Sequence, residues 1–345
     1  GVAAGSASHG LSHLLFDLLH PAYLPLFAKG LDIWNDDPAV TTSILKLWLE
    51  LSDGLRDERS RFPSASPAPL ILFKQLCASL QAYGTRLVQT PVQEGIDMYK
   101  RRYKGMSVAM SAFAAALNGE WSGLGALSIY GDSCMHDTAS MLVHFALSIP
   151  WAQLMSFPKV ATAYYGLVEA LLGQCMEVVA GFDTRVVVEM LGTLQRGLAN
   201  ALQHRILIQC AKAIDYFGTF LFRNKLRQTD LASRIKQHLT QVPTLVSELQ
   251  TLLIRQILTD EHTDVGIMSH PLLSLILADD ACFALVCQRF VSRQRVDVQQ
   301  NAAEAFKDIM TGIGRNLEIS TRRKFMRNVQ AFRARLRPWD ELVLD

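Results

Sequence analysis

Hydrophobic residues recur along the chain at intervals of three and four, the spacing of one face of an α-helix. Ile44, Trp48, Leu51 and Leu55 follow this spacing near the N-terminus. Two further stripes are Val187, Leu191, Leu194, Leu198 and Leu202, and then Phe325, Val329, Phe332 and Leu336. Alternation with a period of two, which would indicate strands, is nearly absent. The pattern therefore predicts an all-α chain whose helices pack through these stripes.

Capping residues mark where these helices are expected to begin. An Asp, Ser or Thr at the N-cap, sometimes with proline in the first turn, is the usual chemistry of a helix start. The predicted starts are Asp36-Asp37-Pro38, Asp132, Asp183-Thr184, His270-Pro271 and Asp297. The helices between them are ~11–20 residues long and the turns are short, a combination that makes antiparallel hairpins.

The length of the chain favours an array of such hairpins. A single hydrophobic core stops growing at ~250–300 residues, and this chain has 345. At ~40–47 residues per HEAT or armadillo unit, residues 1–345 are expected to form one array of about seven or eight HEAT-like hairpins, an α-α superhelix or solenoid. Residues 60–69 are rich in proline and serine, so we expect a loop between two helices there.

Composition and charge narrow the functional classes. The chain is 50% hydrophobic and 19% charged, with a net charge of +2. That charge gives no strong field for a polyanion, so we expect no direct binding of nucleic acid. The six cysteines show no Cys-x-x-Cys spacing, and a disulfide framework is not expected in a chain of this length. No apolar run approaches the ~20 residues of a membrane span, so no membrane insertion is expected.

The sequence contains no convincing catalytic or metal-binding motif. Gly131-Asp132-Ser133-Cys134-Met135 begins like a nucleophile elbow but lacks the closing glycine. Cys134 has two histidines nearby in sequence, His136 and His144. Those histidines are eight residues apart, about two helical turns, too far to share a tetrahedral site without other ligands. We therefore expect a protein that is not an enzyme and that binds neither a metal nor a cofactor.

The strongest concentration of charge lies close to the C-terminus. Residues 320–337 contain no acid and seven bases: Arg322, Arg323, Lys324, Arg327, Arg333, Arg335 and Arg337. A hydrophobic stripe runs through the same segment, so a basic amphipathic helix is predicted at 320–337. Two interpretations remain open. The charges are either the solvated face of a terminal capping helix or a docking surface for an acidic partner.

Several segments of the chain resemble, in the same order, those of a known family. They are Phe16–Pro25, Trp34–Thr42, Leu147–Pro150, Tyr164–Leu167, Pro271–Leu277, Gly312–Leu317 and Ala331–Arg333. Taken together, they resemble the C-terminal region of nuclear export receptors of the exportin-seven and Ran-binding-protein-seventeen type, members of the importin-β superfamily of karyopherins. The resemblance covers nearly the whole chain.

The resemblance implies the C-terminal arch of a longer karyopherin. Such a receptor carries folded protein cargo with basic surfaces through nuclear pores. It binds Ran in its GTP form mainly through N-terminal repeats that we expect to lie outside this chain, and it also binds Phe-rich nuclear pore proteins. A monomer that shuttles between nucleus and cytoplasm is expected, with no catalytic residue. The alternative is another helical-repeat scaffold, of the phosphatase-regulator or vesicle-coat type, which would share the stripes but not the ordered segments.

Overall fold

The computed structural model describes residues 13–54, 62, 66–89, 97–119, 124–200, 203–227, 229–259 and 264–336. Within these ranges every regular element is helical and no strand occurs. The chain folds into two compact units, Gly1–Val186 and Val187–Asp345. The all-α, HEAT-like fold predicted from the hydrophobic spacing is confirmed, whereas the single array of seven or eight hairpins stays a prediction.

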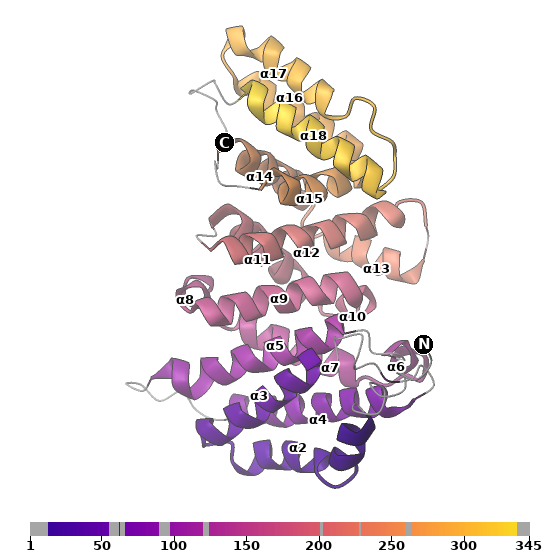
Figure 1. Cartoon of the computed structure of the whole chain (residues 1–345). Helices are drawn as coiled ribbons and strands as arrows, with labels where there is room; N and C mark the ends of the chain where they lie inside the picture. Colours follow the sequence, from indigo (N-terminus) through magenta and orange to yellow (C-terminus); the bar gives the residue numbers. More distant parts are fainter. Residues whose placement is uncertain are drawn as a thin grey trace, which may run out of the picture. The chain divides into compact units, whose positions relative to one another are not determined.

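The helices of the first unit stack in two layers. They are α2 (Leu24–Ile33), α3 (Pro38–Gly54), α4 (Ala68–Gln89), the π-helix η2 (Tyr99–Tyr103), α5 (Lys104–Asn118), α6 (Leu124–Ile129), α7 (Cys134–Leu147), α8 (Trp151–Ser156), α9 (Pro158–Gln174) and α10 (Met176–Ala180). α2, α4 and α7 pack side by side in one layer, and α3, α5 and α9 in the other (Figure 1). The long helices therefore alternate between layers along the chain, as in arrays of helical hairpins.

Helix α5 forms the centre of the first unit. It lies between α3 and α9, and nearly all of its residues are buried. Ala109, Ala112 and Ala116 are fully buried there, and their small side chains let the neighbouring helices approach closely. Aromatic rings fill the space on either side: Phe113 meets Phe73 of α4 at a centroid distance of 5.9 Å. A helix covered on all sides has no need of a polar face, which explains the apolar sequence of α5.

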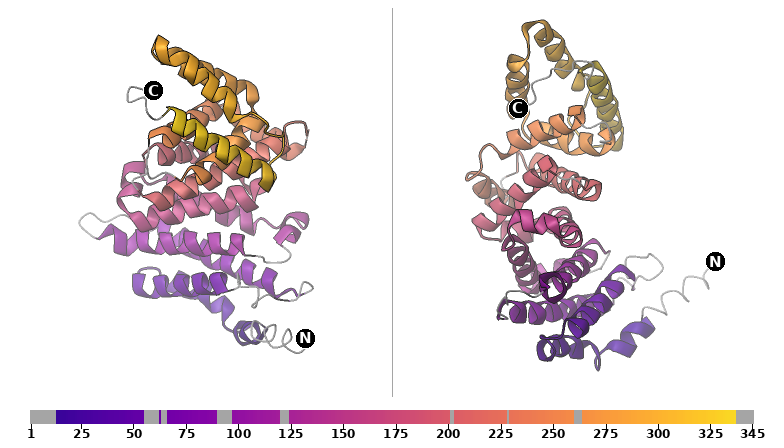
Figure 2. Two further views of the ribbon diagram at one scale, coloured as in Figure 1. Left: turned by 45° about the horizontal axis from the view of Figure 1, so that its top comes forward. Right: turned by 90° about the vertical axis from the view of Figure 1, so that its left-hand side faces the viewer.

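The second unit is built around α15. Its helices are α11 (Thr184–Asn200, which begins just before the unit does), α12 (His204–Arg223), α13 (Asp230–Leu239), α14 (Leu245–Thr259), α15 (Val265–Ala278), α16 (Asp280–Arg293), α17 (Val296–Ile309) and α18 (Ile319–Leu336). α15 packs against α12, α14 and α18, while α16 packs against α14 and α17 (Figure 2). These neighbours bury α15 along nearly its whole length, and α16 is left with two separate faces at the surface of the unit.

The three predicted stripes are buried to different degrees. Val187, Leu191, Leu194 and Leu198 are at most 2% exposed, and the stripe on α18 is equally well buried. The first stripe is rotated from its prediction, because α3 buries Leu45, Trp48 and Ser52, leaving Ile44 and Leu51 half-buried. Trp48 occupies the middle of that face, with its ring 5.6 Å from Phe27 of α2. Leu55 and Leu202 lie outside the described residues.

Three of the five predicted helix starts are confirmed by their capping hydrogen bonds. In each case a side-chain oxygen of the aspartate accepts a hydrogen bond from the backbone N–H two residues later. The donors and distances are Ala39 to Asp37 at 2.8 Å, Cys134 to Asp132 at 3.0 Å, and Arg185 to Asp183 at 2.8 Å. Each bond satisfies an N–H in the first turn that has no partner within its helix.

Of the other two predictions, the start at His270-Pro271 is wrong, whereas a helix does begin beside Asp297. Pro271 lies inside α15, which begins at Val265 after its cap Asp264. An interior proline costs ~3 kcal/mol, and the extensive burial of α15 offsets that cost. Asp297 stands in the first turn of α17 but does not cap it, and its carboxylate pairs with Arg295.

Half of the predicted loop at 60–69 lies outside the described residues. Residues 62 and 66–69 are described, and α4 already begins at Ala68, whose N–H donates to the Ser66 hydroxyl at 3.3 Å. Among the described helices, none alone is long and apolar enough to cross a membrane. Only α15 and α16 taken together are long and apolar enough, and the chain bends by 116° between them.

Candidate docking surface

Helix α18 is the basic helix predicted at residues 320–337, and its hydrophobic stripe faces the interior of the second unit. Phe325, Val329 and Leu336 are fully buried. Phe332 is 3% exposed, and its ring lies 4.9 Å from that of Phe306 in α17. The charged residues therefore occupy the remaining faces of the helix. Arg337, the last predicted docking residue, lies outside the described residues.

Arg322 is an internal residue of the unit and not part of an open surface. Its Nη1 atom donates to both carboxylate oxygens of Asp215 in α12, at 3.0 Å each, and its Nε donates to the carbonyl of Leu317 at 3.3 Å. The side chains of Arg322 and Asp215 are only 16% and 18% exposed. A planar guanidinium that shares both oxygens of a carboxylate is held in a fixed orientation. Arg322 therefore joins α18 to α12.

Arg335 is engaged in a similar way with α17. Its guanidinium donates to Asn301 at 2.5 Å, to Glu304 at 2.6 Å and to Asp308 at 3.1 Å. The Arg335 side chain, by hydrogen bond and charge, holds the pKa of Glu304 below its usual value. Three acceptors on one helix use most of the donors of the guanidinium. The second predicted docking arginine is thus also a contact between helices.

What remains of the predicted surface is a group of three exposed bases: Arg323, Lys324 and Arg327. Within the described part of the chain, none of the three pairs with a carboxylate. Lys324 lies over Gly312, whose φ of 67° is in the left-handed region and where an added Cβ would come within 2.5 Å of the Lys324 Nζ. Arg333 is half-buried and has interactions of its own.

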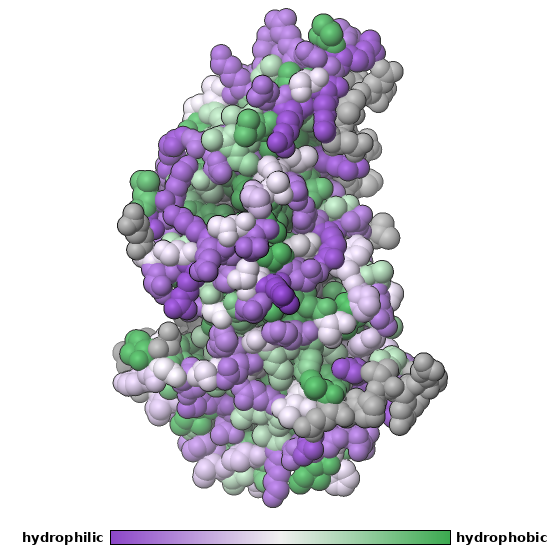
Figure 3. Space-filling view, turned by 180° about the vertical axis from the view of Figure 1, so that it is seen from behind, coloured by the Kyte–Doolittle hydropathy of each residue, from purple (hydrophilic) through white to green (hydrophobic). Residues whose placement is uncertain are grey.

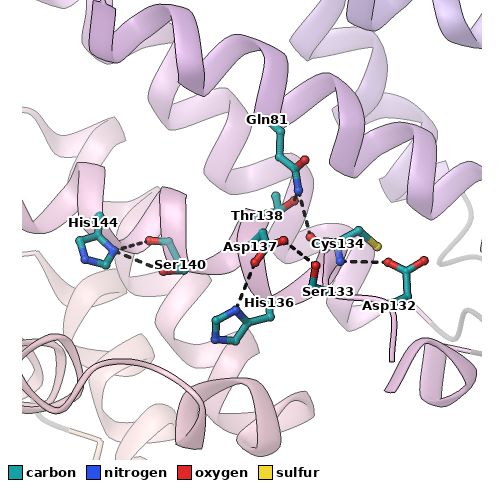
Figure 4. Close-up of polar contacts among 9 residues, drawn as sticks. All are labelled: Gln81, Asp132, Ser133, Cys134, His136, Asp137, Thr138, Ser140 and His144. Carbon is teal, nitrogen blue, oxygen red and sulfur yellow. Dashed lines mark hydrogen bonds and ion pairs between the residues drawn. The ribbon is translucent and has the colours of Figure 1, made fainter. Parts of the chain in front are cut away.

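The segment that resembled a nucleophile elbow forms the start of α7 (Figure 4). Asp132 caps the helix and pairs with Lys74 of α4 at 2.6 Å, and this pair lowers the pKa of Asp132 to about 2. Ser133 donates to Asp137 at 2.7 Å within the same helix. Gln81 of α4 donates to Thr138 at 3.0 Å. The contacts of Asp132 with Lys74 and of Thr138 with Gln81 attach α7 to α4, whereas the hydroxyl of Ser133 is engaged with Asp137 of its own segment.

The two histidines of α7 point to separate local partners (Figure 4). A ring nitrogen of His136 lies 3.4 Å from Asp137, and one of His144 lies 2.8 Å from the carbonyl of Ser140. In the part of the chain that the structure describes, no three His, Cys, Asp or Glu side chains come together in a way that could hold a metal ion.

Two grooves flank α16, and neither was predicted from the sequence. The groove between α16 and α17, which we call the apolar groove, has a volume of about 410 Å³. It is lined mainly by Phe283, Ala284, Cys287, Val291, Ala303 and Phe306, with Asp280, Gln288 and Lys307 among the remaining residues. Burial raises the pKa of the Cys287 thiol to about 12, so the thiol is protonated and behaves as a small apolar group.

The groove between α14 and α16, which we call the basic groove, has a volume of about 180 Å³. Its floor is Ile254, Val286 and Phe290, and its rim carries three arginines: Arg255, Arg289 and Arg293. On the face of the molecule shown in Figure 3, hydrophilic residues predominate and hydrophobic residues form smaller groups between them. The helical spacing of α16 indicates both grooves, because the residues that line each of them recur every three or four positions. One face carries Phe283, Cys287 and Val291, and another carries Val286, Arg289, Phe290 and Arg293.

The sequence is similar to three named relatives over almost its whole length. It is 29% identical to exportin-7-B of Xenopus laevis over 341 residues, which are 96% of this chain and 31% of that protein. It is 27% identical to Ran-binding protein 17 of Homo sapiens, covering 93% of this chain and 30% of that protein. It is 28% identical to Ran-binding protein 16 of Drosophila melanogaster, covering 93% of this chain and 30% of that protein. The chain is homologous to the C-terminal region of an exportin-7-type protein.

The resemblance to exportin-seven-type receptors, inferred from ordered segments of the sequence, is therefore confirmed. The chain spans about a third of the length of the curated relatives it matches. No protein-family model matches the chain, and no solved structure matches it significantly. The exportin relatives are transport receptors and not enzymes.

Proposed function

We propose that the chain is part of a nuclear transport receptor that carries folded protein cargo through nuclear pores in a cycle dependent on Ran-GTP. The observation that carries this proposal is the similarity to exportin-7 and Ran-binding protein 17 over more than nine-tenths of the chain. A different helical-repeat scaffold, such as a phosphatase regulator or a vesicle-coat protein, would share the helical stripes without this similarity. The proposed role needs no catalytic residue and no cofactor, because a receptor acts by binding and release.

The apolar groove supports the proposed contact with Phe-rich pore proteins. Its aromatic and aliphatic lining lies between two helices of the second unit, and Ala284 and Ala303 are exposed on opposite sides of it. A phenylalanine ring from an extended segment would bury most of its apolar surface there, and small residues on both walls leave space for it. Weak binding at such grooves would let a receptor pass through a pore without remaining in it.

The remaining elements of the proposal follow from the same similarity. The receptor would bind Ran in its GTP form and cargo with folded, basic surfaces. It would act as a monomer that shuttles between nucleus and cytoplasm and is found transiently at the nuclear pore. Because the chain spans about a third of its relatives' length, Ran binding is to be measured on the full-length protein as well as on this chain. We expect Ran bound to a non-hydrolysable GTP analogue, and not Ran-GDP, to bind the full-length protein.

The pore contact is tested by placing a charge in the apolar groove. Ala284→Glu together with Ala303→Glu puts two carboxylates where a phenylalanine would enter, while Ala281→Glu adds the same group elsewhere on the exposed surface of α16. We expect the double variant to lose binding to a Phe-Gly repeat peptide and to lose accumulation at the nuclear envelope of permeabilised cells. The Ala281→Glu control should retain both. Absence of envelope accumulation by the unchanged, full-length protein would contradict the transport role itself.

A further inference from the structure

We propose that the basic groove between α14 and α16 binds an acidic, extended segment of a partner protein that places one apolar side chain on the groove floor. The groove would bind such a segment whether or not the chain takes part in transport. Its lining comes from one face of each helix: Thr251, Ile254 and Arg255 on α14, and Val286, Arg289, Phe290 and Arg293 on α16.

The floor of the groove is well ordered by its packing. Ile254 and Val286 are 2% and 4% exposed. Phe290 is half-buried, and its ring lies 5.1 Å from Phe306 in an edge-on contact. Because Phe306 also contacts Phe332 of α18 at 4.9 Å, Phe290 is held by a chain of rings that reaches across α17. A floor held in this way presents a fixed apolar surface to a ligand, so little ordering has to be supplied on binding.

The charges of Arg289 and Arg293 on the rim are not paired with an acid among the described residues. Arg289 and Arg293 are exposed and one helical turn apart on α16, and like charges at this spacing repel each other and destabilise the helix. In the described part of the chain no carboxylate pairs with either of them, and no acid lines the groove. Arg255 has an interaction of its own, so Arg289 and Arg293 are the pair on which recognition depends. An acidic ligand would offset their repulsion.

The chemistry of the rim favours carboxylates of a peptide over other ligands. All three bases are arginines, whose planar guanidinium groups bind carboxylates in a bidentate manner and also stack on aromatic rings. A volume of about 180 Å³ is below the ~300–1,000 Å³ of a typical small-molecule site, so it has room for one side chain and not for a whole drug-sized ligand. Arg289 and Arg293 beside an apolar floor therefore suit an acidic segment that carries a single aromatic or aliphatic residue.

The probe for this proposal is a fluorescein-labelled peptide of sequence Asp-Glu-Asp-Phe-Asp-Glu-Asp, titrated with the whole chain and followed by fluorescence anisotropy. Arg289→Gln with Arg293→Gln removes the two rim charges. Arg323→Gln with Arg327→Gln removes an exposed pair with the same i,i+4 spacing on α18 and is the matched control. Helix content and the melting temperature of both variants are measured to establish that they are folded.

We expect the groove variant to bind the peptide at least about tenfold more weakly, because two charge-assisted contacts are lost. The α18 variant should remain within about twofold of the unchanged chain, since exposed charges of this kind contribute little. A peptide with Ala in place of Phe should bind several-fold more weakly, because the floor is left unfilled.

Three outcomes would overturn the proposal. Equal losses in both double variants would mean that the peptide binds by net charge alone. Binding that appears only after residues 338–345 are removed would assign the groove to the chain's own acidic end, which carries Asp340, Glu341 and Asp345. A single-stranded oligothymidine that binds more tightly than the peptide, and through the same two arginines, would make the partner a nucleic acid.

Discussion

Helix α18 and the basic groove both carry arginines, but their arginines have different roles. α18 has its bases close together in sequence, and Arg322 and Arg335 are used in ion pairs with α12 and α17. The basic groove collects Arg255 and Arg289 from positions far apart in the chain, and together with Arg293 they surround an apolar floor. The density of charge in the sequence therefore does not identify the open surface, because two arginines of the run on α18 are held in ion pairs, while Arg289 and Arg293 pair with no carboxylate in the described part of the chain.

The largest expected difference between the two regions is in stability. Arg322→Ala leaves the Asp215 carboxylate, which is 18% exposed, without its guanidinium, and we expect this to lower the free energy of unfolding of the second unit by ~2–3 kcal/mol. Arg289→Ala removes an exposed rim residue and should change the free energy of unfolding by less than about 0.5 kcal/mol.

Native-state hydrogen exchange is the appropriate measurement, because a chain of two units need not unfold in one step. The amides of α12 and α18 report on the second unit directly, and Arg323→Ala on the exposed side of α18 is the control. If Arg322→Ala and Arg323→Ala were equally mild, the division of α18 into internal and exposed arginines would be incorrect.

The second-largest expected difference between α18 and the basic groove is in the dependence of peptide binding on salt concentration. Binding of the acidic peptide to the basic groove depends on exposed charges, which are screened beyond ~8 Å at physiological ionic strength. We expect its dissociation constant to rise about five- to tenfold between low and moderately high salt, mainly through slower association. Stopped-flow fluorescence gives the association rate, and the peptide that lacks Phe should show the same salt dependence. An affinity unaffected by salt would mean that the arginines of the rim do not contribute.

Charge reversal on α18 should have a smaller effect. Arg323→Glu with Arg327→Glu changes only exposed residues, and Phe325, Val329 and Phe332 remain packed beneath them. We expect the melting temperature to move by no more than ~2 °C and the acidic peptide to associate within about twofold of its original rate. A loss of partner binding comparable with that of the groove variant would restore α18 as the docking surface.

The smallest effect concerns pH at Asp280, at the opposite end of α16 from the basic rim. Hydrogen bonds from Arg315 and then Lys225 lower the pKa of this carboxyl to about 2. A lowered pKa means that the pairing stabilises the fold fully above the unfolded value near 4 and is lost as the pH falls through about 2. The difference in melting temperature between the unchanged chain and Asp280→Asn should therefore be constant above pH ~5 and disappear towards pH 2. A difference that grew on acidification would have the wrong sign.

Local chemistry could be predicted from the sequence, and contacts between distant helices could not. Asp37, Asp132 and Asp183 cap their helices because a cap depends only on residues two or three positions away. Pro271 was misassigned because the burial of α15 by α12, α14 and α18 outweighs the local preference of proline. The basic groove was missed for the same reason. α14 and α16 are separated in the sequence by α15, so no local pattern places Arg255 beside Arg289.

The assignment of the basic groove is tested most directly by exchanging the charges on both sides of the contact. Arg289→Glu with Arg293→Glu would be titrated with the acidic peptide and with a version in which every Asp and Glu is replaced by Lys. We predict that the variant loses the acidic peptide and binds the basic one, with the reverse preference in the unchanged chain, while the Phe in each peptide remains necessary. If the reversed groove bound neither peptide, or if the unchanged chain bound both equally, the arginines would not form the contact and the groove would not be a docking site.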